Sequence, residues 1–220
     1  MKGGCIDKYY VFIIQEKMLK LEYYISKVLK KLKGRAIKNS FIDKTSKVEA
    51  GSTILNTSFG KHSYCGYNCT IINTEIGNFC SISDNVLIGQ ASHSMEWVST
   101  SPVFREGKDS VKAKFAFFPL EEPKKIIIGN DVWIGEGVKI KSGIKIGNGV
   151  VIGMGSVVTR DLEDYGVYAG NPAKLLRKRF SSGLIKELNK IKWWNFDDND
   201  LKKYGKYFNI PSLLVKEYKK

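Results

Sequence analysis

His93 is the residue in this sequence best suited to acid–base chemistry. The chain has two histidines. An imidazole titrates near neutral pH and can take a proton from a hydroxyl as a general base. His62 lies in the run FGKHSY, where we expect a solvated surface residue. His93 opens a segment unlike the sequence before it, and we take it as the candidate general base.

Thiol and metal chemistry have little support in the sequence. The four cysteines, Cys5, Cys65, Cys69 and Cys80, contain no CxxC pair and no cluster with metal-ligand spacing. A reducing compartment keeps such residues as thiols. We expect Cys69 and Cys80 to fill small core positions and Cys65 to lie at a corner of the fold described next. No metal site is expected.

A six-residue repeat sets the elements that must position His93. Aliphatic residues recur every six positions in two series, separated by a break in the period. Thirteen of the fifteen positions are Ile or Val. They are Ile42, Val48, Ile54, Phe59, Cys65, Ile71, Ile76, Ile82 and Ile88, then Ile128, Ile134, Ile140, Ile146, Ile152 and Val158.

A period of six matches neither an α-helix nor an alternating strand. It suits coils of three short strands joined by tight corners and stacked at the strand spacing of roughly 4.8 Å. The aliphatic side chain would point into the prism. Gly, which follows it in eight cases, would permit the corner backbone. The steps predict 17-residue coils starting at Ile42, Phe59 and Ile76, and 18-residue coils from Ile128.

The period breaks after Ile88, and such a long excursion from a regular scaffold is usually functional. Before it stands GNFCSI, ending at Ile82; within it stand His93 and a Ser-Thr-x-Pro-x-Phe run ending at Phe104. With the repeat, these motifs resemble the xenobiotic acetyltransferase branch of the hexapeptide-repeat acyltransferases. That branch includes streptogramin and type B chloramphenicol acetyltransferases and many polysaccharide O-acetyltransferases. The resemblance covers roughly residues 40–200.

The resemblance implies a left-handed parallel β-helix, so we expect an all-β fold with helical appendages. It implies that His93 deprotonates an acceptor hydroxyl, which attacks acetyl-CoA directly. It also implies a homotrimer with active sites between subunits. Glu96, Trp97 and Phe104 are weaker candidates for acceptor binding. Either Glu96 or a backbone carbonyl would orient the imidazole.

The second series resembles the acetyl-CoA groove of this family in the elements VWIG, GSVVTRD and AGNPAK. Acetyl-CoA is therefore the expected co-substrate. Four residues match the backbone positions that meet pantetheine: Gly135, Glu136, Gly153 and Met154. Four more match positions that face the nucleotide, whose phosphates suit Arg and Lys: Thr159, Arg160, Lys174 and Arg177.

The net charge of +14 on 220 residues suggests a nucleic-acid partner, but its distribution argues against one. Residues 1–34 carry a net +5 and residues 174–220 a net +8, whereas the repeat between them carries +1. Neither end contains a nucleic-acid-binding motif. We expect no nucleic-acid partner.

Three segments follow from the patterns. Residues 1–35 form an N-terminal helical extension, residues 36–175 the β-helix acyltransferase domain, and residues 176–220 a C-terminal helical segment. The loop inserted in the β-helix covers residues 92–125.

Residues 15–33 predict an amphipathic helix, with an apolar stripe and lysines at most other positions. The stripe is Met18, Leu21, Ile25, Val28 and Leu32. Two interpretations stay open. The helix packs on its own oligomer or a partner, which we favour, or it makes peripheral contact with a membrane. No apolar run approaches the roughly 18 residues of a membrane span. We expect a cytoplasmic protein, at the inner face of the membrane under the second interpretation.

The predicted activity is acetyl-CoA-dependent O-acetylation of a sugar or polysaccharide precursor. One alternative is inactivation of a streptogramin or chloramphenicol, which the loop motifs favour and the N-terminal helix disfavours. N-acetylation of an amino sugar is also open. A third alternative is a non-catalytic β-helix that binds a glycan or scaffolds a complex; His93 beside the donor groove argues against it.

Overall fold

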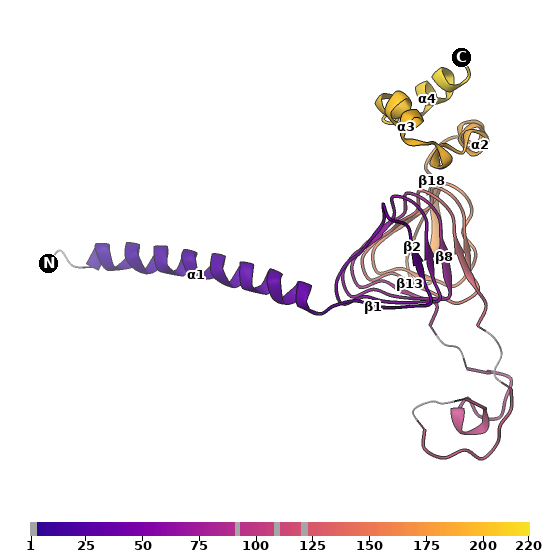
Figure 1. Cartoon of the computed structure of the whole chain (residues 1–220), viewed down its shortest axis with the longest axis horizontal. Helices are drawn as coiled ribbons and strands as arrows, with labels where there is room; N and C mark the ends of the chain where they lie inside the picture. The colour runs from indigo at the N-terminus through magenta and orange to yellow at the C-terminus, as the bar shows by residue number, and fades with distance from the viewer. Residues whose placement is uncertain (1–3, 91–92, 108–110, 120–122) are drawn as a thin grey trace.

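The computed structural model describes residues 4–90, 93–107, 111–119 and 123–220. This part of the chain is a parallel β-helix of three faces, with helices at both ends (Figure 1). The predicted fold class is confirmed. The predicted loop at 92–125 includes residues 92, 108–110 and 120–122, which lie outside the described part.

Short strands form the three faces. The first sheet holds β1 (Ala36–Lys38), β4 (Thr53–Leu55), β7 (Thr70–Ile72), β10 (Leu87–Ile88), β13 (Lys139–Ile140) and β16 (Val157–Val158). The second holds β2 (Phe41–Ile42), β5 (Ser58–Phe59), β8 (Thr74–Ile76), β11 (Ile126–Ile128) and β14 (Lys145–Ile146). The third holds β3 (Lys47–Val48), β6 (Tyr64–Cys65), β9 (Ser81–Ile82), β12 (Trp133–Ile134), β15 (Val151–Ile152), β17 (Gly166–Ala169) and β18 (Lys174–Lys178).

The strand registers confirm the two predicted coil lengths. Ile42 pairs with Phe59 and Phe59 with Ile76, which are steps of 17 residues. In the second series Ile128 pairs with Ile146, a step of 18. The repeat aliphatics fill the prism, and Phe59, Ile82 and Ile134 are among the fully buried ones.

The small residues four positions after the aliphatic residue tie one coil to the next. Ser63 is 1% exposed, yet its hydroxyl donates to the carbonyl of Gly77 at 2.8 Å and accepts from the backbone N–H of Cys80 at 2.9 Å. Ser52 makes the matching bonds to Gly66 and Cys69. A buried hydroxyl satisfied in both directions costs little to bury, which explains why Ser recurs at this position.

Close packing between coils, and not an unusual backbone angle, explains the glycines that follow the aliphatic residues. Gly77 and Gly135 are not among the residues with positive φ. A Cβ on Gly77 would lie 2.5 Å from the carbonyl oxygen of Gly129 in the next coil, and one on Gly135 would lie 2.6 Å from the Met154 nitrogen. The left-handed corner positions are held by other residues, such as Asn56 and Asn85.

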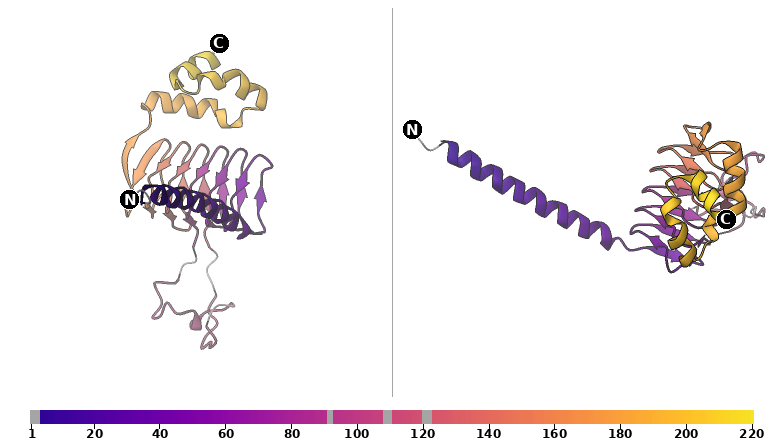
Figure 2. Two further views of the ribbon diagram at one scale, coloured as in Figure 1. Left: turned by 90° about the vertical axis from the view of Figure 1, so that its left-hand side faces the viewer. Right: turned by 90° about the horizontal axis from the view of Figure 1, so that it is seen from above.

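Each corner of the prism carries a different appendage (Figure 1). We call them the first corner, after the first sheet; the second corner, after the second sheet; and the third corner, after the third sheet. The inserted loop leaves the first corner, after β10. The C-terminal helices pack on the second corner, and the N-terminal helix α1 enters the prism at the third (Figure 2).

The C-terminal segment forms a second hydrophobic cluster on the second corner. Its helices are α2 (Ser182–Ile191), η2 (Trp193–Asn195), α3 (Asp198–Tyr204), η3 (Gly205–Tyr207) and α4 (Pro211–Tyr218). Trp193 is 8% exposed and its ring centroid lies 5.0 Å from that of Phe79 in the β-helix. The Asn78 side chain donates to the carbonyl of Trp194 at 3.0 Å. An ion pair at 2.9 Å joins Arg179 to Asp131, although burial raises the pKa of that carboxyl.

Helix α1 (Gly4–Leu32) projects from the third corner as an arm (Figure 2). The predicted stripe residues are all exposed, from 49% at Ile25 to 73% at Leu32. Its last turn contacts the β-helix, because the ammonium of Lys30 lies 3.3 Å from Asp84 and 3.9 Å from the centre of the Tyr67 ring. Among the described residues, no helix combines the length and the hydropathy that crossing a bilayer requires.

Candidate active site

The inserted loop has internal structure that fixes the residues after His93. A 3₁₀ turn, η1 (Pro102–Phe104), is capped by the Ser101 hydroxyl, which accepts from the backbone N–H of Val103 at 3.4 Å. A bridge then pairs Arg105 with Phe118. The Lys114 ammonium donates to two carbonyl oxygens, those of Pro102 and Arg105, at 2.8 and 3.0 Å.

His93 is exposed, and one ring nitrogen is held by the loop backbone. Its Nδ1 lies 2.6 Å from the carbonyl oxygen of Thr100. A carbonyl oxygen only accepts hydrogen bonds, so Nδ1 carries the proton and donates. In the neutral ring Nε2 is then unprotonated and able to accept a proton. Of the two predicted ways to orient the imidazole, the backbone carbonyl is the contact that the structure contains.

Glu96, Trp97 and Phe104 come together around one pocket of about 600 Å³ in this loop. Val98, Ser99, Phe118 and Pro119 complete its lining. The Trp97 and Phe118 rings meet edge to face, with centroids 5.4 Å apart. The walls are therefore aromatic and aliphatic except for Glu96 and Ser99. Ser99 stands next to Thr100, the residue that holds His93.

A second cavity, a groove of about 630 Å³, runs along the third corner. Four predicted pantetheine residues line it together: Gly135, Glu136, Gly153 and Met154. Tyr64, Gly66, Ser83, Asp84 and Trp133 are among the others. In four successive coils the strands before the corner are in register, Tyr64 with Ser81, Trp133 and Val151. The groove is thus a straight channel along the prism axis.

The predicted nucleotide residues do not line this groove. Thr159 and Arg160 follow β16 and are exposed at the first corner, on the side of the prism from which the loop leaves. Lys174 and Arg177 lie on β18, which with β17 forms the end of the third sheet. This end of the sheet lies beyond the coil that contributes Gly153 and Met154 to the groove.

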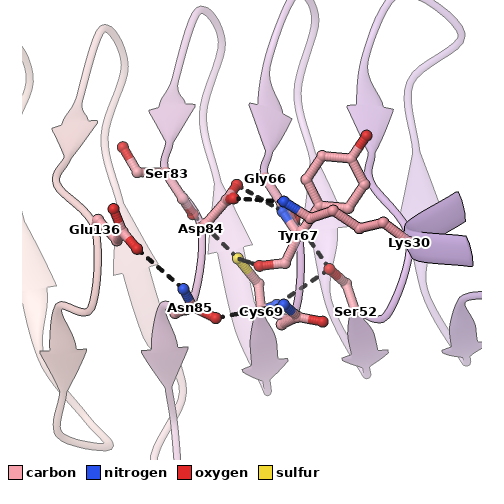
Figure 3. Close-up of polar contacts among 10 residues, drawn as sticks. Lys30, Ser52, Gly66, Tyr67, Cys69, Ser83, Asp84, Asn85 and Glu136 are labelled. Atoms are coloured by element: carbon pink, nitrogen blue, oxygen red, sulfur yellow. Dashed lines mark hydrogen bonds and ion pairs between the residues drawn. The ribbon is translucent and has the colours of Figure 1, made fainter. Parts of the chain in front are cut away.

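Two carboxylates in the groove wall are held by neighbours from adjacent coils (Figure 3). Glu136 accepts from the Asn85 side chain at 3.1 Å. Asp84 accepts from the backbone N–H of Tyr67 at 2.8 Å through one oxygen and pairs with Lys30 through the other. The helix α1 is therefore in direct contact with a residue that lines the groove.

The remaining candidate residues are placed as expected from the repeat. Cys69 and Cys80 are fully buried, and burial raises the pKa of the Cys80 thiol to about 12. Cys65 is buried in the core as well, at an inward repeat position. His62 is exposed and packs against the Phe79 ring at 4.9 Å. Within the described ranges no three His, Cys, Asp or Glu side chains gather as metal ligands.

Several lining residues were missed by sequence reasoning. Tyr64, Ser83 and Asp84 had a usable signal, because counting 17 residues from Gly66 gives Ser83, and the insertion then aligns Ser83 with Gly135. Phe118 had none, because its contact with Trp97 depends on the irregular path of the loop.

Known proteins resemble this chain over the same region. A family model described as Bacterial transferase hexapeptide (six repeats) matches residues 125–160. A chloramphenicol acetyltransferase of Agrobacterium fabrum is 41% identical over 130 residues, 57% of this chain and 61% of the relative. A probable macrolide acetyltransferase of Lysinibacillus sphaericus is 38% identical over 127 residues, 56% of this chain and 69% of the relative. The chain thus matches roughly three fifths to two thirds of the length of these relatives.

Among solved structures, the N-acyltransferase AntD of Bacillus cereus, in complex with dTDP and 3-hydroxybutyryl-CoA, has a TM-score of 0.50 at 20% identity. The match covers 78% of this chain and 97% of AntD. At this identity the likeness supports the fold alone.

Residues 125–160, which match the family model, contain all four of the predicted pantetheine residues in the groove. The β-helix, its two coil lengths and the loop after β10 agree with that match. On this evidence, and on the shared identity with the macrolide relative, the chain belongs to the hexapeptide-repeat acyltransferases, in their xenobiotic acetyltransferase branch.

Proposed function

We propose that this protein transfers an acetyl group from acetyl-CoA to a hydroxyl group, with His93 as the general base. The observation that carries the proposal is the hydrogen bond between His93 Nδ1 and the Thr100 carbonyl. It fixes the tautomer in which Nε2 accepts a proton, as a general base requires. The acetyltransferase names of the relatives support the same reaction.

The reaction is a direct transfer. Nε2 of His93 takes the proton from the acceptor hydroxyl as its oxygen attacks the thioester carbonyl carbon. The new C–O bond forms and the C–S bond of the thioester breaks. The proton on Nε2 then passes to the leaving thiolate, which restores the neutral imidazole and releases CoA.

The donor lies in the groove at the third corner, with pantetheine along Gly135, Glu136, Gly153 and Met154. Glycine at the first and third of these positions leaves the backbone open to close approach. The phosphates lie toward the end of the sheet that bears Lys174 and Arg177, because cationic side chains favour phosphate there.

A single chain holds the two halves of this site at different corners, since the His93 loop leaves the first corner and the groove follows the third (Figure 1). A homotrimer solves this. The first corner of one subunit, with His93, Thr159 and Arg160, faces the groove of the next. The exposed apolar residues of the loop, such as Phe115 at 76% and Phe117 at 72%, support contact with a neighbouring copy.

The acceptor is a largely apolar alcohol of the antibiotic type. A sugar presents many hydroxyls and needs matching polar partners, because each unpaired polar group buried in a pocket is costly. The pocket beside His93 offers Trp97, Val98, Phe104, Phe118 and Pro119 against two polar residues. This lining favours the antibiotic alternative over the sugar acceptor, which stays a prediction.

A thiol-release assay tests the function. Purified protein with acetyl-CoA is expected to release CoA with at least one of chloramphenicol, a streptogramin or a macrolide, and to give background release with simple sugars. Turnover on sugars alone would reverse the choice of acceptor. Failure to bind acetyl-CoA, measured by calorimetry, would overturn the proposed function as a whole.

We further propose that α1 contacts an anionic membrane surface. Its side chains from residue 15 to 32 are exposed, and residues 1–34 hold eight lysines against three acidic residues. Each lysine near an anionic bilayer contributes about 1 kcal/mol. Replacing three of them with Glu should therefore weaken binding to phosphatidylglycerol vesicles by about 100-fold or more. The three are Lys17, Lys20 and Lys27.

A matched charge change elsewhere controls for net charge. Glu at Lys202, Lys203 and Lys206, on the C-terminal helices, removes the same number of cations and is expected to leave vesicle co-sedimentation unchanged. Equal losses in the two triple variants would show that only overall charge matters. Equal binding of the unmodified protein to neutral phosphatidylcholine vesicles would remove the electrostatic contact.

A further inference from the structure

The donor groove has two chemically different ends. At one end, past Gly153 and Met154, the third sheet continues into β17 and β18, which carry Lys174 and Arg177. At the other end the groove starts at Tyr64 and Gly66. Since the CoA phosphates favour the cationic end, the acyl group points toward Gly66. The wall there bears the carboxylate of Asp84, which repels phosphate.

Helix α1 reaches the groove at this acyl end (Figure 3). Tyr67, next in sequence to Gly66, lies under the Lys30 ammonium at 3.9 Å from the ring centre. The same ammonium lies 3.3 Å from Asp84, which itself lines the groove. The Lys30 side chain thus crosses from α1 over the second coil to the third.

We propose that Lys30 closes the acyl end of the donor groove and restricts the acyl group to short chains. This inference rests on the proposed function. Two contacts hold the side chain across the channel end: the ion pair with Asp84 and the cation–π contact with Tyr67. An acetyl group stops short of them, whereas a longer acyl chain must displace the ammonium and break both contacts.

Binding of two thioesters to the full chain tests this directly and needs no acceptor. The wild-type protein is expected to bind acetyl-CoA more tightly than hexanoyl-CoA. Lys30→Ala removes the obstruction and should raise the relative affinity for hexanoyl-CoA by roughly tenfold, because two modest contacts no longer have to break. Acetyl-CoA affinity itself should change little.

Two further variants sharpen the test. Lys31→Ala makes the same charge change one residue further along the exposed helix and should leave the affinity ratio at the wild-type value. Asp84→Asn removes the charge that holds Lys30 but keeps an oxygen to accept from the Tyr67 backbone. It should shift the ratio in the same direction as Lys30→Ala by a smaller factor, roughly threefold.

The outcomes separate the two proposals. Equal ratios for Lys30→Ala and Lys31→Ala, or equal affinity of the wild-type protein for both thioesters, would overturn the role of Lys30 and leave the acetyl transfer proposal standing. If the wild-type protein binds neither thioester, the proposed function itself is wrong, and the role of Lys30 falls with it.

Discussion

His93→Ala should lower kcat for acetyl transfer by about 10²- to 10⁴-fold, the range that a positioned general base contributes. The dissociation constant of acetyl-CoA should stay within about twofold of the wild-type value, because the groove residues lie on another corner of the prism. Steady-state thiol release gives the first quantity, and calorimetric titration with acetyl-CoA gives the second.

His62→Ala is the matched control, since it removes the other histidine of the chain from an exposed corner. It should retain wild-type kcat. A loss of acetyl-CoA binding in His93→Ala equal to the loss of rate would contradict the base role and would instead assign His93 to donor binding or to the subunit contact.

Phe59→Ala is expected to lower the free energy of unfolding by about 3–5 kcal/mol, the usual cost of removing a fully buried phenyl ring. Phe59 is 0% exposed and pairs in the second sheet with Ile42 on one side and Ile76 on the other. Its loss leaves a cavity inside the narrow prism that the strands on either side cannot close without breaking their registers. Urea unfolding followed by circular dichroism, at one fixed protein concentration, measures the change.

Phe41→Ala removes the same side chain from the neighbouring strand of the same sheet. Phe41 is 65% exposed, so its replacement should change the free energy of unfolding by less than about 0.5 kcal/mol. Similar losses for the two variants would mean that the inward and outward positions of the repeat do not differ in energy. The assignment of Phe59 to the core would then be wrong.

The fold could be read from the sequence because one local rule repeats. Each coil buries its aliphatic residues against the next coil, so a single period fixes strand, corner and register together. The change from 17 to 18 residues was visible for the same reason. The reason for glycine at Gly77 was not, since contact with the Gly129 carbonyl depends on how closely the coils approach.

The candidate site was only partly predictable. Gly135 and Gly153 sit on the repeat, so their shared position in the groove follows from the register. His93 could be singled out by its chemistry, but its partner, the Thr100 carbonyl, could not, because a backbone atom leaves no mark on residue type. The contact between Lys30 and Asp84 joins two segments with no common pattern.

The inserted loop also bears on how the chain folds. Most strand pairs join residues 17 or 18 apart, but β8 and β11 pair Ile76 with Ile128 across the whole insertion. Closing a segment three times longer costs about 1 kcal/mol more in chain entropy. The coils before the loop and those after it can therefore each propagate from neighbour to neighbour, whereas joining them is the least local step of folding. Destabilised variants should part at that seam, with the segment up to Ile88 and the segment from Ile126 exchanging amide hydrogens as separate cooperative units.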